Sequence, residues 1–296
     1  MRCATNIRQI CSARWDWIKM VAINTIGAMQ HAAKARLAGS DAASLDVDLL
    51  LGHALQLTRA ELWARTDQPL DQGQQRSIER LIEQRAAGTP IAYLIGRQSF
   101  WEHEFWVTPE TLIPRPDTEL LIETILAQSG EQAHRVIDLG TGSGAIAISL
   151  AKARPNWFVY ATDRSAAAIA VARKNAQGMS NITFAVADWL SAFASGTFDI
   201  VVANPPYIAA GDPHLEALRF EPESALVAKK AGLADLQDII SGTKRVLRPN
   251  GYLLVEHGYN QQAQVVQAVQ TATLQPIRLN DLAGRPRAVL AKREPL

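Results

Sequence analysis

From Asp117 to the C-terminus, short apolar runs typical of buried strands alternate with stretches of helical periodicity. This alternation constrains the fold most, because parallel strands must be joined by crossovers that usually contain a helix. We therefore expect an α/β domain with a mostly parallel sheet. Ligands of such sheets bind at the carboxyl ends of the strands, so functional residues should directly follow the strands. The strand candidates are RVIDLG (135–140), FVYATD (158–163), ITFAVAD (182–188), DIVVANPP (199–206), GYLLVEHG (251–258), PIRLND (276–281) and AVLAKR (288–293).

The residues before Asp117 follow two different patterns. Between residues 24 and 88 the apolar spacing is helical, which predicts a small helical bundle. One of its helices should begin at Thr58, because Thr58 and Glu61 have the spacing of a capping box. Residues 91–116 are rich in aromatic side chains, β-branched side chains and turn formers, which predicts short strands in a connecting ribbon. One apolar stripe of the bundle consists of Ile26, Met29, Ala33 and Leu37.

These patterns divide the chain into four segments. Residues 1–22 form an N-terminal extension that is either disordered or a misassigned start. A transit peptide is the alternative there, because the segment is basic and poor in acids. Residues 23–89 form the helical domain and residues 90–116 the strand-rich linker. Residues 117–296 form the sheet domain, in which Asp117 is the expected N-cap of the first helix.

Charge and composition exclude several classes of protein. Residues 1–22 hold four cations and one anion, a net +3, which leaves −2 for the rest of a chain whose formal charge is +1. A near-neutral body offers no overall attraction to nucleic acid. No stretch approaches the roughly 18 apolar residues of a membrane-spanning helix and no secretion signal is present, so we expect a cytoplasmic globular protein that binds no membrane. Cys3 and Cys11 are expected to be free thiols, and the histidines and cysteines lack the spacing of a metal site.

The first strand of the sheet domain leads into VIDLGTGSGAIAISLA, in which Gly140, Gly142 and Gly144 precede a helix. Glycines allow a tight turn there and let backbone N–H groups approach a ligand closely. Asp163 ends the next strand, where its carboxylate can accept hydrogen bonds from both hydroxyls of a ribose. The motif therefore predicts a cofactor that contains adenosine. With Ala145 the glycines also satisfy the dinucleotide fingerprint, and a purely structural glycine turn is a further possibility.

Asp188 and Trp189 follow the third strand. The Asp188 carboxylate can accept a hydrogen bond from an adenine amino group, with the indole packed nearby. Alternatively, Asp188 caps a helix and Trp189 belongs to the core. Polar residues thus close four successive strands, at Asp138, Asp163, Asp188 and Asn204. Because the carboxyl ends of parallel strands meet at one edge of a sheet, we expect these residues to form one site.

The fourth strand runs into Asn204-Pro205-Pro206-Tyr207. Proline fixes its own φ, lacks an N–H and pushes the preceding residue toward an extended conformation, so this segment is rigid. The side-chain oxygen of Asn204 and the carbonyl of Pro205 can both point at one NH2 group. Tyr207 offers a flat face against which a planar amide or base can lie. We therefore predict that these four residues form a catalytic site for a planar NH2 group.

An amide or adenine nitrogen is a weak nucleophile because its lone pair is delocalised into the adjacent π system. Two acceptors that hold its hydrogens would direct the lone pair at an electrophile, so that proximity and fixed dipoles supply most of the catalysis. Such a site needs no strong base, since the alkylated nitrogen can lose its proton to water. The electrophile that this chemistry implies is the sulfonium methyl group of S-adenosyl-L-methionine.

With these motifs the sequence resembles the protein-(glutamine-N) methyltransferases known as PrmC or HemK, which modify class-1 peptide chain release factors. The resemblance covers roughly residues 23–296, whereas residues 1 to about 20 are usually lacking in family members. It implies a seven-stranded Rossmann-like class I methyltransferase domain, preceded by a small helical bundle for substrate recognition and a β-hairpin linker. It rests on TLIPRPDTELL, VIDLGTGSGAIAISLA, ATDRS, ADWL, NPPYI, DPHL with RFEPESALVA, LLVEHG and NDLAGRPR.

The resemblance and the residues together give two sets of site residues. For the substrate they indicate the NPPY segment with Arg115, which could instead be a loop ion-pair partner, and Glu221. The resemblance implies that the segment around Glu221 is a lid, although it could simply close a loop over the sheet edge. His257 is expected to be a core residue without a catalytic role. The cofactor set is Asp138, Gly140, Thr141, Gly142, Gly144, Asp163, Arg164, Asp188, Trp189 and Asn204.

We therefore expect an enzyme that methylates the side-chain amide nitrogen of the glutamine in the Gly-Gly-Gln loop of class-1 release factors. It should be a monomer that uses S-adenosyl-L-methionine and neither a metal nor direct contact with nucleic acid. An adenine-N6 nucleic-acid methyltransferase with the same NPPY motif is the alternative, although it would have to flip a base and bind phosphates with basic surface. A nicotinamide-dependent oxidoreductase and a non-enzymatic binding module also compete with this function, and the binding module would leave the NPPY segment unexplained.

Overall fold

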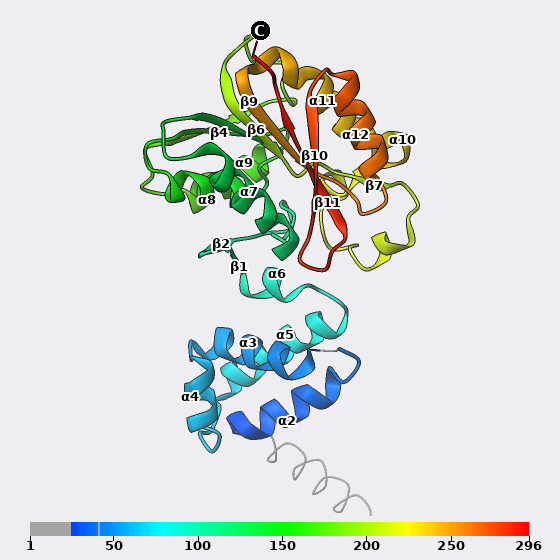
Figure 1. Cartoon of the computed structure of the whole chain (residues 1–296). Coiled ribbons are helices and arrows are strands. Elements are labelled where there is room, and N and C mark those ends of the chain that lie inside the picture. The colour runs from blue at the N-terminus through cyan, green and yellow to red at the C-terminus, as the bar shows by residue number, and fades with distance from the viewer. Residues whose placement is uncertain (1–24, 41, 296) are drawn as a thin grey trace, which may run out of the picture. The chain divides into compact units, whose positions relative to one another are not determined.

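The protein is described by a computed structural model that covers residues 25–40 and 42–295 (Figure 1). The expected extension over residues 1–22, with Cys3 and Cys11, lies outside these described residues. None of the helices in the described ranges has the length and apolar character needed to cross a membrane.

The first of two compact units ends at Ile95 and is a helical bundle. Its apolar stripe is buried as the sequence predicts, with 0% of Ile26 and 4% of Leu37 exposed. The capping box is also present, since Thr58 Oγ1 accepts a hydrogen bond from the N–H of Glu61 and the Glu61 carboxylate accepts one from the N–H of Thr58. The helices are α2 (Ile26–Arg36), α3 (Ala43–Leu55), α4 (Arg59–Ala64), α5 (Gln72–Ala86) and α6 (Ile91–Ile95).

The prediction of a strand at the start of the linker is wrong, because residues 91–95 form helix α6. The Pro90 carbonyl closes the first turn by accepting a hydrogen bond from the N–H of Leu94 at 3.2 Å. Ile91 and Ile95 pack against the buried core of the bundle. This packing outweighs the strand preference of β-branched side chains, which depends strongly on context.

The second unit, from Gly96 onward, contains the expected seven-stranded sheet (Figure 1). In the order of the sheet the strands are β10 (Gln275–Asn280), β11 (Pro286–Lys292), β9 (Leu247–Glu256), β6 (Phe198–Ala203), β3 (Arg135–Leu139), β4 (Phe158–Asp163) and β5 (Ile182–Val186). All seven predicted strands are thus confirmed. The strands from β9 to β5 run parallel, while β11 is antiparallel to both of its neighbours. The main helices are α7 (Glu119–Ser129), α8 (Ala145–Ala153), α9 (Ala166–Asn175), α11 (Ala234–Val246) and α12 (Gln262–Thr271).

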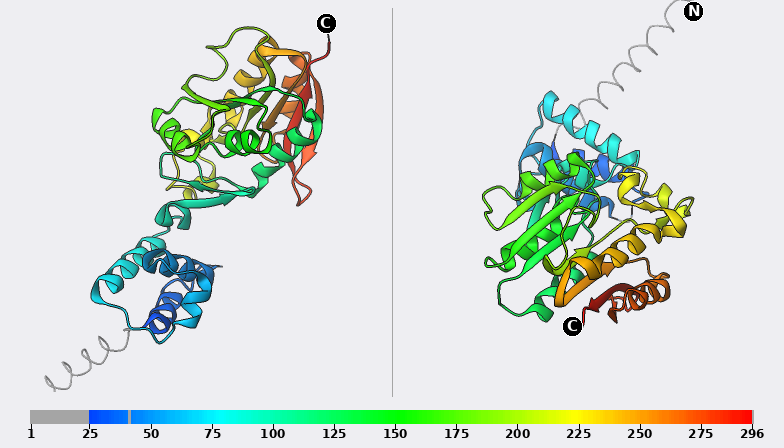
Figure 2. Two further views of the ribbon diagram at one scale, coloured as in Figure 1. Left: turned by 90° about the vertical axis from the view of Figure 1, so that its left-hand side faces the viewer. Right: turned by 90° about the horizontal axis from the view of Figure 1, so that it is seen from above.

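Alternate residues of the central strands face two separate cores. Ile200 and Val202 of β6 belong to a core that includes α7 and α8. Val201 and Ala203 belong to the core on the opposite face, with α11 and α12. The parallel strands are thus buried on both faces, as is usual for such sheets. Figures 1 and 2 show α11 and α12 together on one side of the sheet.

A short antiparallel hairpin, β1 (Arg97–Phe100) and β2 (His103–Trp106), precedes the sheet. The side chain of Asn175, at the end of α9, attaches β2 to the rest of the unit. Its Oδ1 accepts a hydrogen bond from the N–H of Trp106 at 2.8 Å, and its Nδ2 donates to the carbonyls of Trp106 at 2.9 Å and Ser143 at 2.8 Å. One side-chain amide therefore holds both the hairpin and the loop that follows β3.

The start of α7 differs from the sequence prediction. Asp117 does not cap α7, because it lies in the preceding 3-10 helix η1 (Pro116–Thr118). Its carboxylate is instead ion-paired with Arg287 on β11 at 3.0 Å. The cap position of α7 is Thr118, whose hydroxyl makes no capping bond and donates to Glu256 at 2.7 Å. Partners from distant strands thus determine how this helix begins.

The strand order reverses between β3 and β6, since β4 and β5 follow β3 on one side while β6 and β9 lie on the other. Ligands of open α/β sheets bind in the crevice at such a switch point. The glycine loop after β3 and the segment after β6 both leave the sheet at this crevice. That second segment contains β7 (Ile208–Ala209), η2 (Pro213–Glu216), η3 (Glu223–Ala225), β8 (Val227–Ala228) and α10 (Lys229–Gly232).

We expect Asn175→Ala to lower the free energy of unfolding by about 2 kcal/mol, because three hydrogen bonds of modest net value are lost. Urea denaturation measures this change. The matched control is Asn260→Ala, an exposed asparagine whose side chain has no hydrogen bond among the described residues, and it should change stability by less than about 0.5 kcal/mol. Equal losses in the two variants would contradict the anchoring role of Asn175.

Candidate active site

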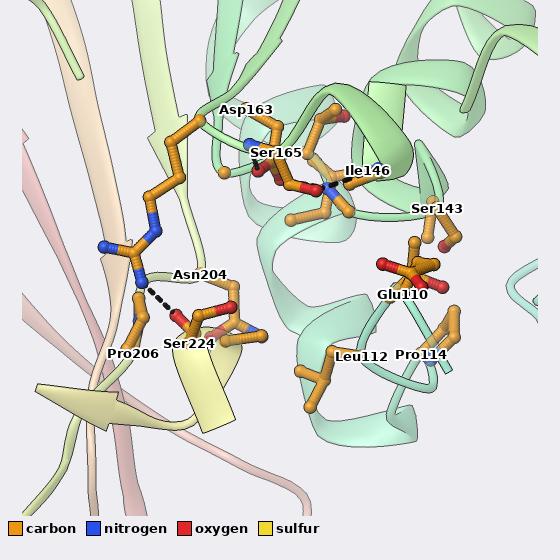
Figure 3. A pocket seen from close by; sticks show the side chains of 18 of the residues that line it. Glu110, Leu112, Pro114, Ser143, Ile146, Asp163, Ser165, Asn204, Pro206 and Ser224 are labelled. Atoms are coloured by element: carbon orange, nitrogen blue, oxygen red, sulfur yellow. Dashed lines mark hydrogen bonds between the residues drawn. The ribbon is translucent and has the colours of Figure 1, made fainter. Parts of the chain in front are cut away.

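A cavity opens at the carboxyl ends of β3, β4 and β6 (Figure 3). It contains about 930 Å³ of empty space, part of it open to solvent. Figure 3 shows Asn204 and Pro206 on one side and Ser143 and Glu110 on the other. The predicted site residues that line this cavity are Arg115, Gly140, Thr141, Gly142, Asp163, Arg164, Asp188, Trp189, Asn204 and Pro206.

The glycine loop between β3 and α8 leaves room for a ligand. Gly140 and Gly142 have φ angles of +71° and +56°, a region that favours glycine. A Cβ at Gly142 would meet no heavy atom within 4 Å, whereas one at Gly140 would lie 3.3 Å from the ring of Trp189. The loop is therefore open over Gly142 and closely packed against the indole at Gly140. Gly144 lies outside the cavity, at the N-cap of α8.

Asp138 supports this loop and does not line the cavity. It is fully buried, and its Oδ2 accepts a hydrogen bond from Thr141 Oγ1 at 2.6 Å. Burial raises the pKa of Asp138 to about 7, against the opposing effect of the Thr141 hydroxyl. Its Oδ1 has no hydrogen-bond partner among the described residues. The geometry thus gives Asp138 a role in holding Thr141, and a direct cofactor contact stays a prediction.

Two of the predicted carboxylates, Asp163 and Asp188, line the cavity, as does Glu110. Asp163, at the end of β4, is fixed by backbone N–H groups, with Gly142 donating to Oδ2 at 3.0 Å and Ser165 to Oδ1 at 2.8 Å. Each of these oxygens keeps acceptor capacity for a ligand. Asp188 is exposed, and its carboxylate has no partner within the described ranges. Because no helix begins directly after Asp188, the alternative that it caps a helix is wrong.

These residues fit an adenosine-containing group with a cationic centre. The fixed Asp163 and the unpaired Asp188 supply acceptors for hydroxyl and amino groups, and the bare backbone at Gly142 admits close approach. Arg115 and Arg164 on the same cavity could pair with a carboxylate. S-adenosyl-L-methionine has all of these groups. The donors and acceptors of this cavity therefore suit that cofactor.

The NPPY segment forms the wall of the cavity after β6. Asn204 Nδ2 donates a hydrogen bond to Thr118 Oγ1 at 3.0 Å, while Asn204 Oδ1 has no partner in the part of the chain that the structure describes. The hydroxyl of Tyr207, which is not among the residues that line the cavity, donates to Glu256 Oε1 at 3.1 Å. Burial, followed by the nearby Glu256 carboxylate, raises the pKa of Tyr207, so the phenol stays protonated. Pro205 is buried outside the cavity lining.

Glu221 does not reach the cavity either. Its carboxylate accepts a hydrogen bond from the N–H of Ile113 at 3.0 Å and is ion-paired with Arg115. Arg115 itself lines the cavity, so it is both a loop ion-pair partner and a candidate substrate residue. Arg164 Nη2 donates to the carbonyl of Ser224 at 2.7 Å (Figure 3). The segment around Glu221 is thereby attached to the cavity at two points.

Sequence reasoning missed several residues of this site. Thr118 and Glu256 lie inside the motifs TLIPRPDTELL and LLVEHG, and the acid that ends the apolar run LLVE is the visible signal for Glu256. Phe100 and Glu110 carry no such signal, whereas Thr111, Leu112 and Pro114 lie in the motif TLIPRPDTELL. Missed residues that line the cavity include Phe100, Glu110, Thr111, Leu112, Pro114, Thr118, Ser143 and Ser224.

The histidines and acids of the described residues do not meet the needs of a metal site. Within the described residues, no group of three or more histidine, cysteine, aspartate or glutamate side chains could hold a metal ion. His257 is fully buried, as expected for a core residue, and burial lowers its pKa.

We expect Gly232→Ala to destabilise the protein, because Gly232 packs directly against the NPPY backbone. A Cβ there would lie 2.1 Å from the Tyr207 carbonyl oxygen, which also accepts a hydrogen bond from Gln261 Nε2 at 2.9 Å. The matched control is Gly178→Ala, which has nearly the same φ (+87° against +86°) but no atom within 4 Å of a Cβ. Denaturant unfolding should show a loss about 1 to 3 kcal/mol larger for Gly232→Ala. Equal losses would mean that Tyr207 is not held by this contact.

Comparison with known families covers both units. The family described as "Methyltransferase domain" matches residues 131–284, and the family described as "PrmC N-terminal domain" matches residues 28–96. Among solved structures, the chain is similar to the hMettl16 catalytic domain in complex with MAT2A 3′UTR hairpin 6, at 17% identity and a TM-score of 0.51 over 63% of this chain and 74% of that one. This similarity concerns the fold alone.

Three curated relatives share a name. The release factor glutamine methyltransferase of Xylella fastidiosa (strain 9a5c) is 44% identical over 254 residues, which are 84% of this chain and 92% of the relative. Those of Salmonella typhimurium and Escherichia coli (strain K12) are 44% and 42% identical, over 81% and 80% of this chain and 87% of each relative. The chain therefore belongs to the release factor glutamine methyltransferase family, and it has the fold of the S-adenosylmethionine-dependent methyltransferases.

Proposed function

We propose that this protein transfers a methyl group from S-adenosyl-L-methionine to the side-chain amide nitrogen of the glutamine in the Gly-Gly-Gln loop of class-1 peptide chain release factors. The observation that carries the proposal is the orientation of Asn204. Its Nδ2 is occupied by Thr118, so its carboxamide oxygen is left to accept a hydrogen from a substrate NH2 group. Membership of the family supports the choice of a release factor as substrate.

S-adenosyl-L-methionine, when bound, supplies an electrophilic sulfonium methyl group. We propose that Asp163 accepts hydrogen bonds from its ribose hydroxyls and that Asp188 accepts one from its adenine amino group. Gly140 and Gly142 would let the backbone of the glycine loop lie close to the cofactor, and Trp189 would line the same cavity. These roles rest on the positions of the residues around the cavity.

We propose that Asn204 Oδ1 and the Pro205 carbonyl each accept one hydrogen of the glutamine NH2 group. This grip directs the nitrogen lone pair toward the methyl group and lends it electron density. Tyr207 and Pro206 would lie on either side of the planar amide, and Arg115 would bind nearby parts of the substrate. Transfer would form the nitrogen–carbon bond at the expense of the carbon–sulfur bond, and the surplus proton of the nitrogen would pass to water. No basic side chain is required for this proton.

We propose that the chain works as a two-domain enzyme. The helical domain over residues 23–89 would bind the release factor outside its glutamine loop, residues 90–116 would connect the domains, and residues 117–296 would carry the reaction. The proposal includes action as a monomer in the cytoplasm, without a metal. The negative net charge of the body supports a protein substrate over a nucleic acid.

Asp163→Ala should weaken cofactor binding, because charge-assisted hydrogen bonds to the ribose are lost and each is worth roughly 1.5 to 3 kcal/mol. Isothermal titration with S-adenosyl-L-methionine measures the dissociation constant, which should rise by about tenfold or more. Asp238→Ala, which removes an exposed carboxylate on α11, is the control and should bind as the wild type does. An unchanged dissociation constant for Asp163→Ala would remove Asp163 from the cofactor site.

Asn204→Ala should leave cofactor affinity nearly intact while the rate of methyl transfer falls on the order of 100-fold or more, as for loss of a contact that stabilises the transition state. Single-turnover assays with saturating cofactor and a release factor measure the rate, with Asn260→Ala as control. A rate close to that of the wild type would show that the carboxamide does not hold the substrate.

The substrate itself is tested by incubating the purified enzyme with labelled S-adenosyl-L-methionine and one of three acceptors. These are a release factor, its variant with alanine in place of the loop glutamine, and duplex DNA. We expect label only in the intact release factor. Label in the DNA would identify an adenine methyltransferase, which uses the same NPPY motif, and equal label in the loop variant would exclude the glutamine.

A further inference from the structure

Glu256 is a buried acid. Hydrogen bonds connect it to both polar side chains of the NPPY segment. It ends β9 and is 1% exposed. Its Oε1 accepts a hydrogen bond from the Tyr207 hydroxyl at 3.1 Å, and its Oε2 accepts one from the Thr118 hydroxyl at 2.7 Å. Thr118 in turn accepts from Asn204 Nδ2 at 3.0 Å. We call these four residues, Asn204, Thr118, Glu256 and Tyr207, the Glu256 relay.

The direction of each bond in the Glu256 relay follows from proton counting. A hydroxyl has one proton, and an ionised carboxylate can only accept. Thr118 must therefore give its proton to Glu256, so its oxygen can only accept a hydrogen from Asn204. If the Asn204 carboxamide were rotated by 180°, two acceptors would face each other without a proton, which leaves buried polar atoms unsatisfied. The ionised Glu256 thus turns the oxygen of Asn204 away from Thr118.

We propose that Glu256 is a positioning residue that sets the substrate class of this site. Through Thr118 it presents the oxygen of Asn204 to the substrate, and through Tyr207 it fixes the aromatic ring beside it. An acceptor at this point binds an NH2 group, whereas a reversed Asn204 would present its own NH2 and repel that group. The inference rests on the proposed methyl transfer to an amide nitrogen.

The surroundings of Glu256 make its charge sensitive to pH. Burial raises the pKa of Glu256 to about 7, while Thr118, Arg287 and Tyr207 oppose this rise and Asp117 adds to it. Because the pKa is raised, Glu256 carries a proton below about pH 7 and can then donate, which removes the constraint on Thr118. The charged or titratable groups in and around the Glu256 relay are Asp117 on η1, Tyr207 after β6, His257 after β9, Asp281 in the β10–β11 turn and Arg287 on β11.

The test compares four variants at saturating cofactor and pH 8. Thr118→Val removes the hydroxyl at similar volume, Thr118→Ser keeps it, and Glu256→Gln removes the charge. Glu123→Gln, an exposed glutamate on α7, is the matched control. Thr118→Val and Glu256→Gln should lower the single-turnover rate on the order of 10- to 100-fold, as expected when a reacting group is misoriented. Thr118→Ser should restore most of the rate, and the affinity for S-adenosyl-L-methionine should stay within about twofold of wild type in all four.

Two pH readouts separate positioning from a structural role. The wild-type rate at saturating cofactor should fall below about pH 7, and this acid limb should be absent in Glu256→Gln. Saturating cofactor is needed because the pKa of the buried Asp138 also lies at about 7. The side-chain amide signals of Asn204, assigned by ¹⁵N NMR through their loss in Asn204→Asp, should shift with the same midpoint in wild type and stay constant in Glu256→Gln.

The NMR readout needs no substrate, so it tests the Glu256 relay independently of methyl transfer. If the wild type failed to methylate a release factor, only the proposed function would be refuted. Unchanged rates and Asn204 signals in Thr118→Val would overturn the inference. A parallel fall in thermal stability, cofactor affinity and rate, with no rescue by Thr118→Ser, would also overturn it and leave Glu256 a structural residue.

Discussion

The parallel pairing of β3 with β6 is the constraint on which the rest of this molecule depends. Its register sets Leu139 opposite Ala203, so the glycine loop and Asn204 leave the sheet side by side at one edge. Both strands are buried on both faces, and a slip by one residue would turn every core side chain to the wrong face. The hydrophobic core therefore fixes the distance between the glycine loop and the NPPY segment, and the polar hydrogen bonds only refine this distance.

Features with a strong local signal could be predicted from the sequence. The apolar strands and the residues that follow them place Asp163, Asp188 and Asn204 on one cavity, because strand ends are visible in sequence and meet at one edge. Helix α6 could not be found in this way, since its two isoleucines favour a strand locally but pack against the bundle core as part of a helix. The capping box at Thr58 was recognised because both partners are three residues apart.

Contacts between distant segments could not be predicted from spacing. Thr118 and Glu256 are 138 residues apart, and Arg115 and Glu221 are 106 apart. Local rules describe neighbours in sequence, so they predict a helix cap at Asp117, whereas its carboxylate is ion-paired with Arg287 of β11. Residues such as Glu256 that act through another side chain are the part of an active site that sequence reasoning misses most easily.

Asn175 has a consequence beyond stability. Its planar amide holds the backbone of Trp106 at one end and the Ser143 carbonyl at the other, and partial double-bond character keeps such a group rigid. A shift of the Ser143 carbonyl would therefore strain the bonds to Trp106 through the same side chain. The hairpin and the glycine loop, which are far apart in the sequence, are thus connected mechanically by one planar amide.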